Sequence, residues 1–281
     1  MNKAEIKKMF EEKCERLGLS QERAAVQAGS KGSTVSAVFS GKYGADDTAI
    51  YKLLAAWVGY DESWRVVPTR NFQFVTRTLD EARKTSEMFM LIGDAGCGKS
   101  EAQKQYAQLN KNSFRICCDE FWGRNEFIAE ILKQMGKSGD GYNLAQKVDL
   151  IANTFIQLER PLLMIDEFDK LSNQVIHLLI SLYNRLEGRC GITISATDHL
   201  EQRFQRGLKF NRRGYKELWS RCGRKPIQLL KTSEKDIKQV CLANGIDNDF
   251  HVSRVIAECE GDMRRIKRYK QKMEMDLATA A

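Results

Sequence analysis

The stretch "MFMLIGDAGCGKS", residues 88–100, constrains the fold of this chain more than any other feature. Its first five residues form an apolar run typical of a buried strand, and the rest completes the phosphate-loop pattern G-x-x-x-x-G-K-[ST]. Glycines let such a loop wrap closely around a polyphosphate, because side chains would block its inward-pointing amides. A glycine-rich turn that binds nothing is the alternative, which the strand-then-helix context disfavours. The sequence therefore predicts a nucleotide-binding α/β domain.

Each part of the loop has a predicted task. Lys99 is expected to reach the terminal phosphates, and the Ser100 hydroxyl is expected to ligate Mg²⁺. The helix that starts near Gly98 adds the positive end of its dipole to the phosphate site. The predicted nucleotide-binding residues of this loop are Gly93, Asp94, Ala95, Gly96, Cys97, Gly98, Lys99, Ser100 and Glu101.

The second half of the site is predicted at "LLMIDEFDK", where an apolar strand runs into two acids. Asp166 is placed to hold the magnesium ion through its water shell, and Glu167 to orient and polarise the attacking water. Adjacent residues of a strand face opposite ways, so the two acids can take different roles only because the strand ends there. A salt-bridged acidic turn is the alternative. The two motifs together predict ATP or GTP hydrolysis, and ATP is favoured because no N-K-x-D-type guanine-reading segment is visible.

Apolar runs separated by amphipathic helical segments predict a parallel sheet covered by helices on both faces. The expected strands after the first lie at 113–118, 161–166, 191–197 and 225–230. The expected domains are residues 1–62, a linker at 63–71, an ATPase core at 72–230 and a C-terminal helical segment at 231–281.

Residues 1–62 are predicted to form a helical unit that contains a helix-turn-helix. Ser20 can cap one helix of the pair, Gly29 ends it, and the next helix begins at about Ser33. Short polar side chains near the start of such a helix suit the DNA major groove. A three-helix protein-interaction domain is the alternative. The DNA-reading candidates are Lys31, Ser33, Thr34 and Ser36.

The net charge of +8 is concentrated in residues 203–225, which carry nine lysines and arginines and one acid, Glu217. Interleaved aromatic residues make this segment suitable for contacts with a phosphate backbone and with neighbouring subunits. A solvated basic face is the alternative. The candidates for DNA contact are Arg206, Lys209, Arg212 and Arg213.

Composition gives further expectations about location and redox state. No window approaches 18 uncharged apolar residues, and the N-terminus has no apolar core suited to a signal peptide. We therefore expect a cytoplasmic protein without a membrane partner. The eight cysteines form no C-x-x-C pair and are expected to be reduced thiols.

The segments "GDAGCGKS", "LLMIDEFD", "GITISATDH" and "GDMRR" occur in the order typical of AAA+ ATPases. Together with the N-terminal helices, they make the chain resemble the AAA+ ATPases of phage and insertion-sequence transposition. The resemblance implies three further nucleotide-sensing positions and one DNA contact. These are Thr197 or Asp198 as sensor 1, Arg221 or Arg224 as an arginine finger, Arg264 or Arg265 as sensor 2, and Arg124 at the DNA.

By this resemblance, the chain is expected to be an ATP-dependent DNA-binding ATPase without sequence specificity, acting in a bacterial host cell. It would form oligomers or filaments on duplex DNA and deliver that target to a transposase. A helicase loader or replication initiator is one alternative, and a helix-turn-helix transcriptional regulator with an ATPase switch is another. A metabolic kinase is disfavoured because no second-substrate signature is visible.

Overall fold

The computed structural model describes residues 2–61 and 64–280, the last four of these by their backbone alone. The chain divides into two compact units between Arg65 and Val66. The domain limit predicted at 62/63 lies outside the described residues, and helix α5 begins at Arg70, inside the predicted linker. None of the helices described is long and apolar enough to cross a membrane.

The N-terminal unit consists of short helices around one apolar core. Ser20 caps the second helix by accepting a hydrogen bond from the Arg23 amide, and Gly18 ends the first in the left-handed conformation. The Phe10 ring lies 5.1 Å from Trp57 and 5.5 Å from Phe39, which ties the first helix to the fourth and the third. The helices are α1 (Lys3–Leu17), α2 (Gln21–Gln27), α3 (Gly32–Phe39) and α4 (Thr48–Val58).

Helices α2 and α3 form the predicted pair, separated by a turn that contains Gly29. Val35 and Val38 are buried, whereas Lys31, Ser33 and Ser36 are exposed and Thr34 is half-buried. The polar side chains therefore share the outer face of α3. That this pair reads DNA stays a prediction.

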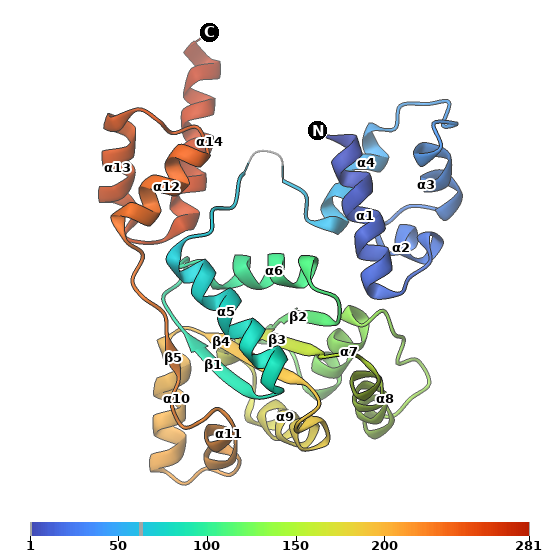
Figure 1. Ribbon diagram of the computed structural model, residues 1–281, viewed down its shortest axis with the longest axis vertical. Helices are drawn as coiled ribbons and strands as arrows, with labels where there is room; N and C mark the ends of the chain where they lie inside the picture. The colour runs from blue at the N-terminus through green and yellow to red at the C-terminus, as the bar shows by residue number, and fades with distance from the viewer. Residues whose placement is uncertain (1, 62–63, 281) are drawn as a thin grey trace. The chain divides into compact units, whose positions relative to one another are not determined.

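The second unit is built on a five-stranded sheet in the order β2-β3-β4-β1-β5, and every neighbouring pair is parallel (Figure 1). This confirms the predicted fold class, a parallel sheet flanked by helices. The strands are β1 (Met88–Ile92), β2 (Ser113–Cys117), β3 (Leu162–Asp166), β4 (Gly191–Ala196) and β5 (Ile227–Gln228). The helices around them are α5 (Arg70–Thr85), α6 (Lys99–Leu109), α7 (Arg124–Gln134), α8 (Leu144–Gln157), the 3-10 turn η1 (Phe168–Lys170), α9 (Asn173–Leu186), α10 (Asp198–Lys209) and α11 (Tyr215–Arg221).

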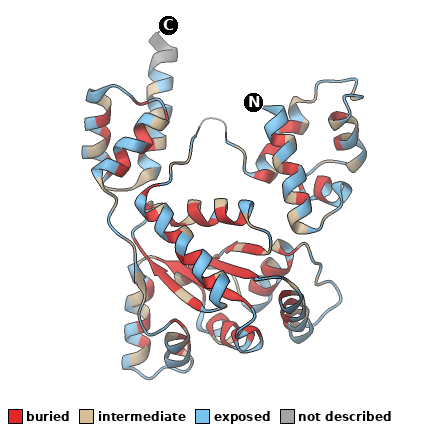
Figure 2. Cartoon of the chain, viewed as in Figure 1, coloured by how far each residue is buried: buried red, intermediate tan, exposed pale blue. Residues whose placement is uncertain are grey.

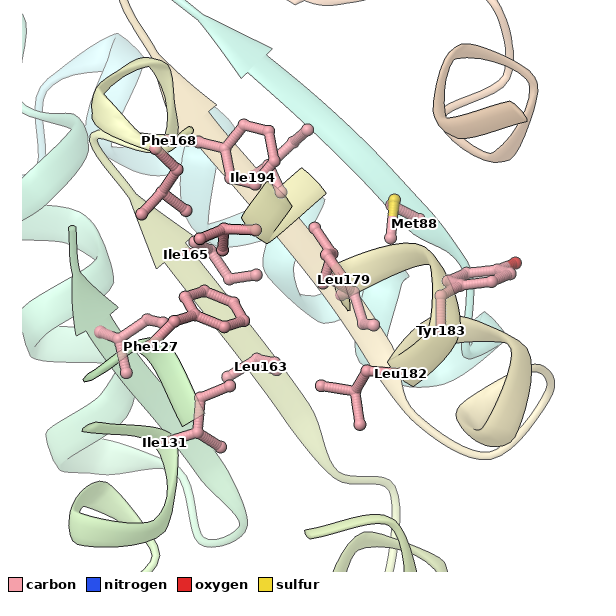
Figure 3. Packing of buried hydrophobic residues seen from close by; sticks show 14 of the residues in the cluster. Met88, Phe127, Ile131, Leu163, Ile165, Phe168, Leu179, Leu182, Tyr183 and Ile194 are labelled. Atoms are coloured by element: carbon pink, nitrogen blue, oxygen red, sulfur yellow. The ribbon is translucent and has the colours of Figure 1, made fainter. Parts of the chain in front are cut away.

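The central strands are buried on both faces, as their continuous apolar sequences predict (Figure 2). Helices α5 and α6 cover one face, where Leu79 and Ala102 pack against Leu91. Helices α7, α8 and α9 cover the other, where Phe127 and Leu179 pack against the alternate strand residues (Figure 3). This packing fixes the carboxyl ends of β1, β3 and β4 at one edge of the sheet.

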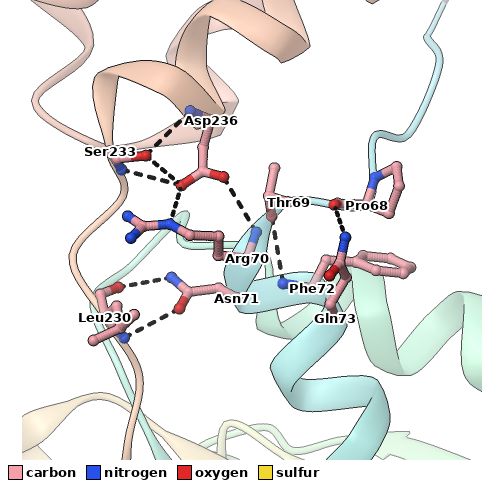
Figure 4. A network of polar contacts seen from close by, with 9 residues as sticks. All are labelled: Pro68, Thr69, Arg70, Asn71, Phe72, Gln73, Leu230, Ser233 and Asp236. Carbon is pink, nitrogen blue, oxygen red and sulfur yellow. Dashed lines mark hydrogen bonds and ion pairs between the residues drawn. The ribbon is translucent and has the colours of Figure 1, made fainter.

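The edge strand β5 is shorter than the segment 225–230 predicted from its apolar residues. Only Ile227 and Gln228 pair with β1. Beyond them the Asn71 side chain binds both backbone groups of Leu230, accepting from its amide at 3.1 Å and donating to its carbonyl at 2.7 Å (Figure 4). The Leu229 amide still donates to the carbonyl of Ile92, the last residue of β1, at 2.8 Å, so β5 ends where its partner strand ends and Asn71 binds the chain just beyond.

Three helices follow β5 and are tied to the start of α5. Asp236 accepts hydrogen bonds from the Arg70 amide and guanidinium, each at 3.2 Å, and from the Ser233 hydroxyl at 2.6 Å (Figure 4). Burial alone would raise the pKa of Asp236, but these bonds outweigh it and hold the pKa below its ordinary value. The helices are α12 (Glu234–Ala243), α13 (Asp249–Cys259) and α14 (Met263–Ala280).

The eight cysteines are free thiols, and all except Cys117 are buried. Burial raises the pKa values of the Cys118, Cys190 and Cys222 thiols well above the ordinary value for cysteine. A protonated thiol in an apolar environment is a poor nucleophile, so these side chains serve as packing residues.

Candidate active site

The phosphate loop joins β1 to α6, and two glycines shape it. Gly96 and Gly98 have positive φ angles of 74° and 98°, in the left-handed region that other residues rarely adopt. Gly98 caps α6, whose first amides are free of intrahelical partners. The loop therefore directs backbone N–H groups and a helix dipole at one place, which suits a polyphosphate.

Lys99 lies inside this loop and is only 8% exposed. Its ammonium donates to the carbonyl oxygens of Gly93 at 2.6 Å and Asp94 at 3.0 Å, and lies 3.7 Å from the Cys97 sulfur. These contacts hold the charge at the centre of the loop. Of the other predicted loop residues, Asp94 and Ala95 are exposed, whereas Gly93 and Cys97 are buried.

Asp166 lies at the end of β3 and is almost completely buried, with 1% of its side chain exposed. One carboxylate oxygen accepts from the Arg115 guanidinium at 2.7 Å, and the other accepts from the Ser195 hydroxyl at 2.6 Å. Ser195 in turn accepts from the amide nitrogen of Gln103 at 2.7 Å. The predicted metal carboxylate is therefore fixed by side chains from β2, β4 and α6.

Burial alone would raise the pKa of Asp166, but the Arg115 charge and the hydroxyls of Ser100 and Ser195 outweigh it and hold the pKa below its ordinary value. The folded protein therefore keeps this carboxylate ionised to lower pH than the unfolded chain. The resulting stability is present above the unfolded-state pKa and is lost as the pH falls through the folded one. Ser100 and Asp166, brought together here, offer oxygen donors of the kind that suit a hard divalent cation.

The sequence reasoning missed Arg115, Ser195 and Gln103. Ser195 had a visible signal, because Thr193 and Ser195 are the polar members of an otherwise apolar strand. Both are 1% exposed, and a buried hydroxyl in a sheet core needs a partner. Gln103 and Arg115 had no comparable local signal, since their partners lie far away in the sequence.

Replacing Arg115 with methionine is expected to lower the free energy of unfolding by about 3–5 kcal/mol, because it leaves a buried carboxylate uncompensated. The matched control is Arg185→Met, which breaks the exposed Arg185–Asp149 pair and is expected to cost less than about 1 kcal/mol. Urea denaturation of both variants measures the difference. Equal stabilities for the two variants would contradict the role given to Arg115.

Glu167 follows Asp166 directly but has a different environment. Its φ angle of 55° turns the chain at the end of β3, so that 43% of its side chain is exposed against 1% for Asp166. Its carboxylate forms an ion pair with Lys170 at 2.6 Å. The turn separates the two acids as the sequence predicts, leaving one buried and one accessible to water. The roles given to them stay predictions.

Thr197 and Asp198, the two sensor 1 candidates, follow β4. The Thr197 hydroxyl donates to the Asp169 carboxylate at 3.2 Å, whereas Asp198 is exposed on α10 and accepts from Gln202. Thr197 thus contacts the η1 turn that follows Glu167. Thr197 is therefore the sensor 1 candidate connected to that turn, and the sensing role itself stays a prediction.

The arginine finger candidates lie on α11 and just after it. Arg221 forms an ion pair with Glu187 at 2.6 Å, donates to Asn184 at 3.1 Å, and lies 5.0 Å from the Tyr183 ring centroid. Arg224 is exposed. The contacts described for Arg221 are with α9, with the Glu187 cap that follows it and with Glu217 of α11, and the finger role stays a prediction.

The sensor 2 candidates lie at the start of α14, which contacts the phosphate loop. The Met263 amide donates to the Gly96 carbonyl at 3.1 Å, and a Cβ atom on Gly96 would lie only 1.8 Å from the Asp262 carboxylate. Arg264 binds that carboxylate at 3.0 Å, whereas Arg265 binds the Glu258 carbonyl at 2.8 Å. Arg264 is therefore the candidate connected to the loop.

The DNA contacts predicted in the second unit lie on its exposed surface. Arg124 begins α7, Arg206 and Lys209 lie on α10, and Arg212 and Arg213 lie in the turn before α11. All five side chains are exposed. That they contact DNA stays a prediction.

Comparison with known proteins supports this description of the fold. An AAA domain matches residues 82–204. The ATP-dependent target DNA activator B of Escherichia phage D108 is 22% identical over 255 residues, covering 85% of this chain and 78% of that protein. The protein of the same name from Escherichia phage Mu is 22% identical over the same shares. These relatives confirm the resemblance that the sequence motifs indicate.

Among solved structures, the crystal structure of a DNA replication initiation factor has a TM-score of 0.50 at 12% identity. The match covers 76% of this chain but only 63% of that one, less than two thirds of its length. At this identity the likeness shows the fold alone.

Proposed function

Since the chain is an ATPase with an AAA domain, we propose that it uses ATP to assemble on duplex DNA, without sequence specificity, and to deliver that DNA to a transposase. The assembly would be an oligomer or a helical filament. The two phage relatives, by their names ATP-dependent activators of target DNA, support the DNA part of this proposal. Delivery to a transposase rests on the family resemblance.

The observation that carries the proposal is an exposed group of cations in the same unit as the nucleotide site. A surface pocket of about 580 Å³ is lined by Arg212, Arg213, Lys216, Arg221 and Arg224, with Glu217 as its one acid. Among the residues that the structure describes, only Arg221 of these five cations forms an ion pair with an acid. Unpaired guanidinium groups in a concave surface suit phosphate groups, which they can bind through two parallel hydrogen bonds.

The nucleotide site supports hydrolysis through residues with separate tasks. Ser100 and Asp166 would hold a magnesium ion, which neutralises phosphate charge when bound. Lys99 binds the terminal phosphates through its ammonium. Glu167 would orient the attacking water, because its side chain is partly exposed although it pairs with Lys170, and the buried Asp166 stays ionised beside Arg115.

Assembly would complete the site, because Arg221 or Arg224 would act on the nucleotide of a neighbouring subunit. An arginine supplied in trans stabilises the charge that develops on the transferred phosphoryl group. Arg264 would sense the nucleotide from the start of α14, which rests on Gly96. ATP would thereby favour assembly, and hydrolysis would favour release from DNA.

Electron microscopy of the protein with duplex DNA tests this function directly. Samples with ATP, with a non-hydrolysable ATP analogue and with ADP are compared at equal concentrations. We expect filaments or regular oligomers on DNA with the analogue and none with ADP. Discrete particles at one DNA sequence under all three conditions would contradict the proposal.

Nuclease footprinting of the same samples distinguishes the alternative functions. A transcriptional regulator would protect one operator from nuclease digestion, whereas an assembly without sequence specificity would protect long tracts. A helicase loader or replication initiator would prefer single strands or one origin sequence and would bind a replicative helicase in place of a transposase.

A further inference from the structure

We infer that Arg203, although it belongs to the basic segment 203–225, is not a DNA contact but a positioning residue that couples the nucleotide site to the DNA-binding surface. The inference rests on the proposed function and names the link between its two parts. It starts from the contacts of one side chain, which spans the space between the η1 turn and helices α10 and α11.

All three nitrogens of the Arg203 guanidinium are used inside the protein. Nη1 donates to the carbonyl oxygens of Asp169 at 3.1 Å and Leu171 at 2.6 Å. Nη2 donates to the Asn173 side chain at 2.8 Å, and Nε donates to the Tyr215 hydroxyl at 2.9 Å. A guanidinium engaged by four internal acceptors has little capacity left for a phosphate.

Two of these acceptors belong to the η1 turn and its C-cap, which directly follow Glu167. Asp169 lies two residues after Glu167, within η1, and its carboxylate also accepts from the sensor candidate Thr197. Leu171 ends the same turn. A change in the position of Glu167 therefore moves carbonyl oxygens to which Arg203 is bound.

Arg203 also contacts helix α11, which directly follows the turn that contains Arg212 and Arg213. Tyr215 begins α11 and is 1% exposed, its hydroxyl donates to Asn173 at 2.8 Å, and its ring lies 5.3 Å from Phe204. A Cβ atom on Gly207 would lie 2.2 Å from that ring, so α10 and α11 pack in direct contact. Arg212 and Arg213 lie between helices α10 and α11. Arg203 and Tyr215 connect both of these helices to the η1 turn.

The geometry separates this role from that of a phosphate contact. Arginine presents its donors in a rigid planar fork, whereas lysine has a single charged group on a flexible stem. Lysine at position 203 keeps the charge but cannot reach four acceptors in different directions. A phosphate contact would survive this substitution in large part, and a coupling contact would not.

The test measures DNA affinity for wild type and Arg203→Lys with a non-hydrolysable ATP analogue and with ADP. For the wild type we expect the two affinities to differ by a factor typical of coupled sites, about 5- to 150-fold. For Arg203→Lys we expect that ratio to fall to within about twofold of one, while binding of fluorescent ATP stays at the wild-type value. The matched control is Arg206→Ala, on the exposed side of α10. This variant should weaken DNA binding with both nucleotides and leave the ratio of the two affinities at the wild-type value.

Tyr215→Phe gives an independent measurement if Arg203→Lys fails to fold. It removes the hydroxyl that joins Arg203 to α11 but keeps the buried ring, and we expect it to lower the ratio as well. A wild-type ratio in both variants, or an Arg203→Lys that weakens DNA binding as Arg206→Ala does, would overturn the inference alone. Wild-type protein that binds DNA equally in both nucleotides would overturn the proposed function, and the inference with it.

Discussion

Replacing Lys99 with alanine is expected to weaken ATP binding by about a hundredfold or more and to abolish nucleotide-dependent assembly on DNA. Hydrogen bonds to charged groups contribute about 1.5–3 kcal/mol each, and about 1.4 kcal/mol corresponds to a tenfold change in affinity. Lys99 would make such bonds with more than one phosphate. It now binds Gly93 and Asp94 and is the only lysine or arginine in residues 93–101, so no other residue of the loop can supply its charge. Binding of a fluorescent ATP analogue measures the loss directly.

Lys104→Ala is the matched control for this experiment. Lys104 lies on the same helix, is half-exposed and forms a surface ion pair with Glu101. Its removal should change nucleotide affinity little, since exposed ion pairs contribute less than about 1 kcal/mol. If Lys99→Ala bound DNA with wild-type affinity in the presence of every nucleotide, the proposed coupling between ATP binding and DNA binding would be refuted.

Replacing Glu167 with glutamine is expected to slow ATP hydrolysis by about 10²- to 10⁴-fold, the usual contribution of a positioned acid or base. The substitution keeps size and shape, so ATP affinity should stay at the wild-type value. Because hydrolysis would release the protein from DNA, complexes formed with ATP should become long-lived. Single-turnover hydrolysis and dissociation from labelled DNA measure the two effects separately.

Lys170→Gln controls for the ion pair that Glu167→Gln also breaks. Both residues of that pair are more than a third exposed, so its loss alone should affect stability by less than about 1 kcal/mol. If Glu167→Gln dissociated from DNA at the wild-type rate, hydrolysis would not be the release step. If it hydrolysed ATP normally, the role given to Glu167 would be wrong.

The fold class and the two nucleotide-binding motifs could be predicted from the sequence because they depend on residues that follow one another. The glycines of residues 93–98, the start of α6 and the acids after β3 each act within one short segment. The edge strand β5 was predicted too long, because its length depends on its partner β1, which ends at Ile92 and lies far from β5 in the sequence. Apolar residues alone could not reveal where the partner strand ends.

The sequence by itself determined where a polyphosphate would bind and which acids would stand beside it. Only the tertiary structure decided what holds those acids. Arg115 meets Asp166 across 51 residues of sequence, and Gln103 meets Ser195 across 92. It likewise decided that Arg203, one cation among nine in its segment, binds the carbonyl oxygens of Asp169 and Leu171 in and after the η1 turn. The sequence shows that a residue is arginine but not which acceptors surround it. The role of its planar guanidinium group depends on the acceptors that the folded chain brings within reach.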